Sequence, residues 1–151
     1  MTTSPNQTRG DSPATDRTNA DPEAVRQFAI DAAMTLRDSK CENLIVIDVC
    51  GLSPVTDYLV IGSGTSDRQM LGALQHVEDL AKSLDRSSLG TSKDERATWL
   101  LADYIDVVVH VFEPNARAHY DLEMLWGDGT EVPIPSGPGP MVPKKPSPTD
   151  A

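Results

Sequence analysis

The sequence predicts an α/β protein, in which a single domain carries a mixed β-sheet of four to five strands with helices packed on it. Three observations support this fold class. Long segments carry apolar residues at helical spacing, whereas shorter apolar runs end at glycine, proline or aspartate, as strands do. These segments follow one another in the order α-β-β-α-β-β-α, and pairs of strands between helices are typical of a mixed sheet.

The first helix is expected over residues 22–37. Asp21 offers a side-chain acceptor directly before Pro22, and proline suits the first helical position. Apolar residues then recur on one face of this segment, namely Val25, Phe28, Ala29, Ala32 and Leu36. Residues 44–47 are apolar on both faces and predict a central strand, which the glycine and proline of residues 51–54 end.

A second buried strand is predicted over residues 58–61, and the small residues 62–64 end it. Ser66 and Gln69 form a capping box, which indicates the start of a second helix. This helix is expected to run to about residue 86, because one face carries Met70, Ala73, Leu74, Val77, Leu80, Ala81 and Leu84.

The last third of the predicted domain adds a strand pair and a helix. Residues 89–97 are polar and predict a loop, with room for one short strand near Leu89. Residues 98–102 and 107–112 predict two strands joined by a tight acidic turn. Pro114 begins a last helix that is expected to end at Gly127. Three of its residues are expected to face inward: Ala118, Leu122 and Leu125.

Composition sets the limits of the folded part. Residues 1–21 contain no Val, Leu, Ile or Phe, so they cannot offset an ordering entropy of about 1–2 kcal/mol per residue. Residues 133–151 carry seven of the twelve prolines and predict an extended, unpacked tail. We therefore expect a disordered segment over 1–21, one domain over 22–132, and a Pro-rich disordered tail over 133–151.

Charge and cysteine content exclude several classes of protein. A formal net charge of −10 disfavours general binding to nucleic acid and suits a basic protein partner. Cys41 and Cys50 have no metal-ligand partners at a recognisable spacing, so free thiols are expected, without a metal or other cofactor. Without a membrane-length apolar run or a signal peptide, the sequence predicts a cytoplasmic protein.

The small-residue turn from Gly62 to Ser66 is the one candidate for catalytic chemistry. It lies between a strand and a helix N-terminus, where backbone N–H groups can hold a phosphate. Similar turns occur in nucleotidyltransferase folds, in which carboxylates that alternate along a strand bind Mg²⁺. Asp103 and Asp106 are separated by two residues across a turn and would not share a strand face. A nucleotide-binding transferase therefore remains an alternative, whereas we expect a nucleotidyltransferase-like arrangement without catalytic activity.

The acidic turn and the tryptophans allow a structural and a binding interpretation. The carboxylates of Asp103 and Asp106 can cap backbone N–H groups, or they can present an acidic surface to arginines of a partner. Trp99 begins a strand and is expected to be partly exposed, whereas Trp126 is expected to pack onto the domain. His110 lies within a strand, where a hydrogen-bonded structural role is usual.

Five motifs resemble the ribosomal silencing factor family, also called Iojap-like, over residues 28–126. They are Asp48-Val49, Thr56-Asp57-Tyr58-Leu59-Val60-Ile61, Gly64-Thr65-Ser66-Asp67-Arg68, the block from Trp99 to Phe112, and Leu125-Trp126-Gly127-Asp128. Two positions depart from the family pattern. Leu89-Gly90 stands where members often carry Glu-Gly, and Ile105 stands where they carry glycine. Because a β-branched residue disfavours positive φ, the turn at Ile105 is expected to differ in shape.

The resemblance implies a function in translation. Members of this family bind the large ribosomal subunit at its fourteenth ribosomal protein, block joining of the small subunit, and self-associate as dimers without an established catalytic activity. By this resemblance, the residues expected to face the partner are Trp99, Leu101, Asp103, Tyr104 and Asp106, with His110 as a weaker member. Strand alternation independently places Trp99, Leu101 and Asp103 on one face.

Overall fold

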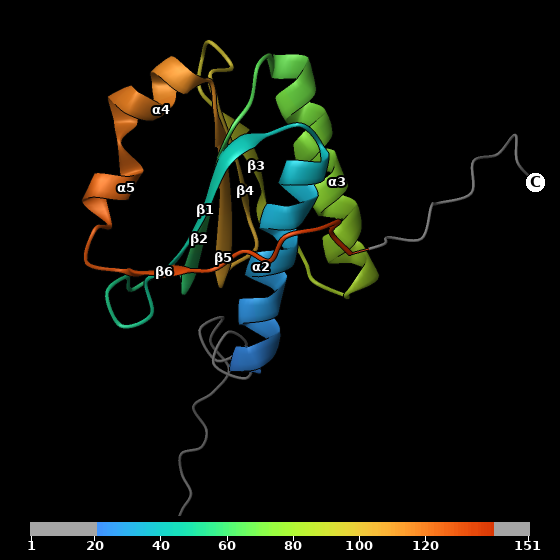
Figure 1. The fold of residues 1–151 in the computed structure, drawn as a ribbon, viewed down its shortest axis with the longest axis vertical. Coiled ribbons are helices and arrows are strands. Elements are labelled where there is room, and N and C mark those ends of the chain that lie inside the picture. The colour runs from blue at the N-terminus through green and yellow to red at the C-terminus, as the bar shows by residue number, and fades with distance from the viewer. Residues whose placement is uncertain (1–20, 141–151) are drawn as a thin grey trace, which may run out of the picture.

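The computed structural model describes residues 21–140 as a six-stranded sheet with helices on both faces (Figure 1). Both long helices begin as predicted, since Asp21 accepts from the Glu23 backbone N–H and Ser66 from that of Gln69. The helices are α2 (Pro22–Asp38), α3 (Asp67–Ser83), α4 (Pro114–Tyr120) and α5 (Leu122–Leu125). The strands are β1 (Glu42–Asp48), β2 (Tyr58–Ser63), β3 (Gly90–Lys93), β4 (Trp99–Asp103), β5 (Val107–Phe112) and β6 (Thr130–Val132).

The sheet is mixed, as the sequence predicts. Its strand order is β3-β4-β5-β2-β1-β6, and β2 pairs with β5 in parallel while the other neighbouring strands pair antiparallel. The number of strands is higher than the predicted four to five. Strand β3 occupies the region where a short strand was allowed for, but β6 was missed because only Val132 of its three residues is buried.

Helices α2 and α3 cover one face of the sheet, where the larger core lies (Figure 1). The buried faces of both helices match the apolar spacing of the sequence, with Phe28 and Leu36 buried on α2 and Met70 and Val77 on α3. They pack on the sheet residues Val46, Val60, Leu100, Ala102, Val107, Val109 and Val111. Among residues 21–140, no helix has the length and apolar character needed to cross a membrane.

Helices α4 and α5 lie against the other face of the sheet (Figure 1), where a smaller core surrounds Ile61 and Phe112. The single predicted helix is broken at Asp121, whose backbone is left-handed at φ 49° and ψ 54°. The break changes which residues face the sheet. Leu122 packs against the smaller core as expected, whereas Ala118 and Leu125 are exposed, so their predicted inward orientation is wrong.

The segment that follows β6 crosses α2 (Figure 1). Ile134 packs against the larger core, the Arg37 guanidinium donates to the carbonyl oxygen of Gly137, and the Gly139 N–H donates to Asp38 Oδ2 over 2.8 Å. The prediction of an unpacked tail from residue 133 is therefore wrong for residues 133–140, because one apolar side chain and two hydrogen bonds attach this stretch. The predicted disorder of 1–20 and 141–151 concerns residues that the structure does not describe.

Candidate protein-binding surface on the sheet

Strand β4 carries three of the residues that were predicted to face a partner. Leu100 and Ala102 of β4 face the larger core, so Trp99, Leu101 and Asp103 point to the opposite face of the sheet, as strand alternation predicts. All three are partly exposed. Their partners across the strand pair are Phe112, His110 and Val108, in that order. We call the row formed by Trp99, Leu101 and Asp103 the β4 face.

Trp99 is fixed in a cluster of aromatic side chains. Its ring lies 5.2 Å from Phe112 at an interplanar angle of 18°, and 4.4 Å from Tyr120 of α4. The His110 ring is stacked 5.8 Å away. Offset and tilted aromatic pairs of this kind add to the stability that burial alone provides. Trp99 is thus held in one orientation while part of its surface stays accessible, which confirms its predicted partial exposure.

A hydrogen bond to His110 fixes the orientation of the Trp99 indole. The indole Nε1–H donates to His110 Nδ1 over 3.1 Å, and because an indole nitrogen only donates, Nδ1 must carry no proton. Burial lowers the pKa of His110 from 6.5 to about 4, which keeps the ring neutral in this role. The predicted hydrogen-bonded structural role of His110 is confirmed. His110 is 7% exposed, so it offers little surface of its own to a partner.

Tyr104 and Asp106 are not exposed, which contradicts their predicted place on the surface. Tyr104 is 2% exposed and its hydroxyl donates to Glu78 Oε1 over 2.9 Å. Burial raises the pKa of Tyr104, and its hydrogen bond to Glu78 raises it further. Asp106 is 4% exposed and pairs with Arg86 at 3.3 Å. Both side chains point into the domain, where they tie the turn to α3 and to the segment that follows this helix.

The turn between β4 and β5 explains this inward orientation. The Tyr104 N–H donates to the Val107 carbonyl over 2.8 Å, and the Asp106 N–H donates to the Tyr104 carbonyl over 2.9 Å. Between them Ile105 has a φ of +77°, so the chain forms a γ-turn despite the β-branched side chain. The expectation that Ile105 would avoid positive φ is therefore wrong. Asp103 Oδ1 accepts from the Ile105 N–H over 2.8 Å, which confirms the capping interpretation for this carboxylate.

An exposed apolar patch on α4 and α5 was not predicted. Met124 is 77% exposed and Leu125 is 69% exposed, and Tyr120 of α4, which is 40% exposed, lies against the ring of Trp99. We call Tyr120, Met124 and Leu125 the α4–α5 patch. It was missed because an unbroken helix would turn Leu125 inward, and no sequence signal other than Asp121, a residue that tolerates left-handed backbone, marks the break.

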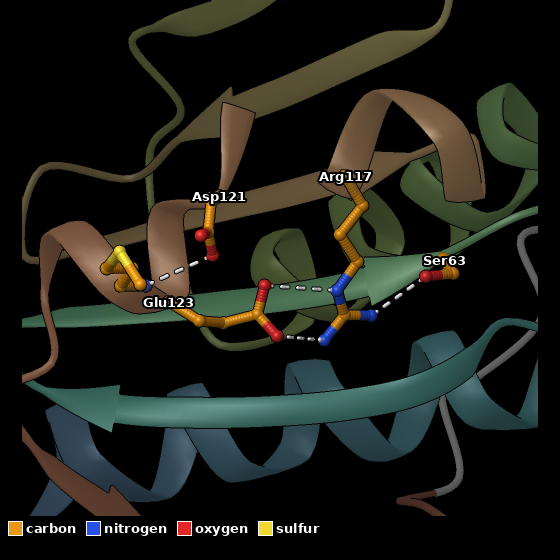
Figure 2. Close-up of polar contacts among 5 residues, drawn as sticks. Ser63, Arg117, Asp121 and Glu123 are labelled. Carbon is orange, nitrogen blue, oxygen red and sulfur yellow. Dashed lines mark hydrogen bonds and ion pairs between the residues drawn. The ribbon is translucent and has the colours of Figure 1, made fainter. Parts of the chain in front are cut away.

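A polar network attaches α4 and α5 to the end of β2 (Figure 2). Arg117 donates through Nη1 to Ser63 Oγ over 2.8 Å, and through Nη2 to Glu123 Oε2 over 3.0 Å. Its Nε also donates to Glu123, which makes the ion pair bidentate. Asp121 begins α5 by accepting from the Met124 N–H over 3.3 Å. The α4–α5 patch is thereby held at a fixed position relative to the sheet.

Two backbone N–H groups of the turn from Gly62 to Ser66 donate to acceptors elsewhere in the domain. The Gly64 N–H donates to the Phe112 carbonyl over 2.8 Å, and the Thr65 N–H donates to Gln69 Oε1 over 2.9 Å. A Cβ atom at Gly64 would lie 2.2 Å from Met70 Cγ, so close packing accounts for this glycine. Within residues 21–140, no three His, Cys, Asp or Glu side chains are grouped to hold a metal ion. Cys41 and Cys50 are both free, as predicted.

Taken with the fold, this geometry defines a small α/β domain with a partly open, aromatic sheet face. A model of the family described as "Ribosomal silencing factor during starvation" matches residues 22–151. The chain belongs to the ribosomal silencing factor family, which confirms the resemblance of its motifs.

Individual relatives and a solved structure are consistent with this family assignment. The chain is 39% identical to ribosomal silencing factor RsfS of Bacillus subtilis over 100 residues, which cover 64% of this chain and 82% of that protein. It is 35% identical to mouse "Mitochondrial assembly of ribosomal large subunit protein 1" over 104 residues, or 66% of this chain and 46% of the mouse protein. A crystal structure of a Chromobacterium violaceum protein aligns with a TM-score of 0.63 at 30% identity, covering 78% of this chain and 95% of that one.

Proposed function

We propose that this protein represses translation by binding the large ribosomal subunit and sterically blocking the joining of the small subunit. The proposed dock is the fourteenth large-subunit ribosomal protein, and the contact surface combines the β4 face with the α4–α5 patch. The family assignment supports the ribosomal role. The observation that carries the choice of surface is Trp99, a partly exposed aromatic residue that His110 and Phe112 hold in one orientation.

The composition of this surface suits a protein interface. Aromatic residues and methionine are enriched at the centres of such interfaces, where a few rigid anchors provide most of the binding energy. Trp99, Tyr120 and Met124 supply anchors of this kind, and the Arg117 network fixes the two short helices, α4 and α5, that carry Tyr120 and Met124. Little conformational entropy is lost on docking when the contact groups are already ordered in the free protein.

The negative charge of this chain favours a partner with a basic surface. The chain has a formal net charge of −10, and Asp103 adds a partly exposed carboxylate to the β4 face. One oxygen of this carboxylate accepts from the Ile105 N–H, which leaves the second oxygen for an arginine or lysine of the partner. Opposite charges on the two partners are expected to raise the association rate, and added salt is expected to lower it.

This mechanism requires a shape and a contact surface, and we propose that the protein has no enzymatic activity. It would act in the cytoplasm, where subunits join. A homodimer that used the same surface would compete with the ribosome, so self-association would reduce repression.

Co-sedimentation with isolated large and small subunits tests the proposal, together with light scattering to follow subunit joining. Met124→Asp places a charge on the α4–α5 patch at a residue whose exposure leaves the fold intact. Val55→Asp is the matched control, because Val55 is 71% exposed in the loop between β1 and β2, outside the proposed surface. The proposal requires large-subunit binding that Met124→Asp weakens and Val55→Asp preserves. Equal binding by both variants would exclude the patch, and no binding by the unmodified protein at physiological salt would exclude the function.

A further inference from the structure

A groove of about 560 Å³ lies between α3 and the edge strand β3, on the face of the sheet opposite the β4 face. Leu74 and Leu100 form its apolar floor, and the exposed Leu71 stands at its margin. Thr91 and Lys93 of β3 pair with Ala102 and Leu100, which face the larger core, so their side chains also point to the helix side. The groove therefore combines an apolar centre with a strand along one wall.

Within residues 21–140, no strand pairs with the outer backbone edge of β3. β3 is the last strand of the sheet, and all four of its residues are exposed. The Asp94 N–H donates to the Trp99 carbonyl, and bonded pairs in an antiparallel ladder alternate along the strand. The next bonded pair is therefore Ser92 with Leu101, and the N–H and C=O groups of Thr91 and Lys93 point away from β4. These four groups are available to an added strand.

Two lysines lie at opposite ends of the groove. Lys82 is in the last turn of α3, close to where the chain enters β3, and Lys93 ends that strand. Neither lysine has an ion pair within the part of the chain that the structure describes. The carboxylate that lines the groove, Glu78, already accepts from the Tyr104 hydroxyl. In a protein of net charge −10, this groove is thus locally cationic at both ends.

We infer that this groove binds an extended, acidic peptide segment of another protein by strand addition to β3. The backbone of the peptide pairs with Thr91 and Lys93, as in other recognition sites that extend a sheet. Alternate side chains of an added strand face α3, so one apolar side chain fills the centre over Leu74 and Leu100. Acidic side chains two positions before and after it meet Lys82 and Lys93. This surface is separate from the proposed ribosomal contact and does not depend on that function.

The test uses the full 151-residue chain labelled with ¹⁵N and a pool of acetylated, amidated heptapeptides. The pool carries Asp or Glu at positions 2 and 6, Val, Ile, Leu or Phe at position 4, and Ser or Thr elsewhere. A second pool carries Lys at positions 2 and 6. We expect the acidic pool to shift the amide resonances of β3 and of residues 71–82, and to slow hydrogen exchange at Thr91 and Lys93. The basic pool should have no such effect.

Two pairs of variants separate the contributions of backbone and charge. Thr91→Pro removes an outward N–H that β4 does not use, whereas Thr91→Ala keeps it. We expect Thr91→Pro to weaken binding of the acidic pool by about tenfold relative to Thr91→Ala. Lys93→Glu should also weaken it, whereas Lys40→Glu makes the same charge change outside the groove and should not.

Several outcomes would overturn the inference. These are no shift with the acidic pool at millimolar total concentration, shifts outside the groove, equal binding of both pools, or equal binding by Thr91→Pro and Thr91→Ala. Analytical ultracentrifugation identifies one more such outcome. If the unmodified protein is a dimer and Thr91→Pro makes it a monomer, a second copy of this chain occupies the edge instead. Met124→Asp should leave peptide binding unchanged, so failure here is distinguishable from failure of the proposed function.

Discussion

The burial of His110, whose Nδ1 accepts from the Trp99 indole, makes the stability of the domain depend on pH. His110 can accept this bond only while Nδ1 is unprotonated, and burial lowers its pKa from 6.5 to about 4. Since the folded pKa is depressed, the unfolded chain binds the proton more readily. The stabilisation is therefore fully present above pH 6.5 and is lost as the pH falls towards 4. Between pH 7.5 and 4.5, linkage predicts a loss on the order of 2–3 kcal/mol from this group alone.

His110→Gln is the matched variant, because the Gln side chain offers an acceptor to the indole and does not titrate. Urea unfolding of both proteins at pH 7.5, 6.0 and 4.5 gives the free energy of unfolding, and groups that titrate in both cancel in the difference. We expect the unmodified protein to lose stability relative to His110→Gln as the pH falls. Parallel profiles would show that His110 titrates alike in the folded and unfolded chain, which would refute the assignment of a neutral acceptor.

Four further outcomes follow from the structure. Trp99→Ala should weaken binding to the large subunit by about 2 kcal/mol or more while its circular dichroism spectrum stays native, and unchanged co-sedimentation would count against the β4 face. Asp103→Lys should slow association and reduce its dependence on salt, which stopped-flow light scattering measures; an unchanged salt slope would exclude an electrostatic role. Ile105→Gly should be more stable to urea than Ile105→Ala by about 1 kcal/mol, because φ at this position is +77°. Arg117→Met should destabilise the domain by about 1–3 kcal/mol in the same assay, since it leaves Ser63 and Glu123 unpaired, and an unchanged midpoint would contradict the network.

Much of the fold was predictable because local patterns and burial agree. The helix caps at Asp21 and Ser66 form as their residue types indicate, and the apolar spacing of α2 and α3 matches their buried faces. The strand alternation that places Trp99, Leu101 and Asp103 together follows from the period of two along β4. Each of these features depends on residues that are close together in the sequence, so the sequence alone is enough to predict them.

The remaining features depend on contacts between distant residues. Tyr104 and Asp106 are polar residues in a turn and were assigned to the surface, but Glu78 and Arg86 give them buried partners. Nothing near position 105 in the sequence indicates that the fold would impose positive φ on an isoleucine. The stretch 133–140 is rich in proline, yet Arg37 and Asp38 supply hydrogen bonds that attach it. For Tyr104, Asp106 and the stretch 133–140, the partner lies at least 20 residues away along the chain.

The residues at the end of β4 and in the turn that follows have different roles, because some side chains point into the domain and one is exposed. The inward side chains of Tyr104 and Asp106 bond to Glu78 and Arg86 and make the turn between β4 and β5 rigid. This rigid turn fixes where β4 ends. Asp103 lies at that end, so substitution of a buried turn residue can move an exposed one. A protein that acts by occupying a surface needs such rigidity, because each contact group that is ordered beforehand spares conformational entropy on binding. Loss of repression in a Tyr104 variant would therefore not make Tyr104 a contact residue. Tyr104→Phe tests whether Tyr104 instead positions the turn, since this variant removes the bond to Glu78 while the buried ring remains.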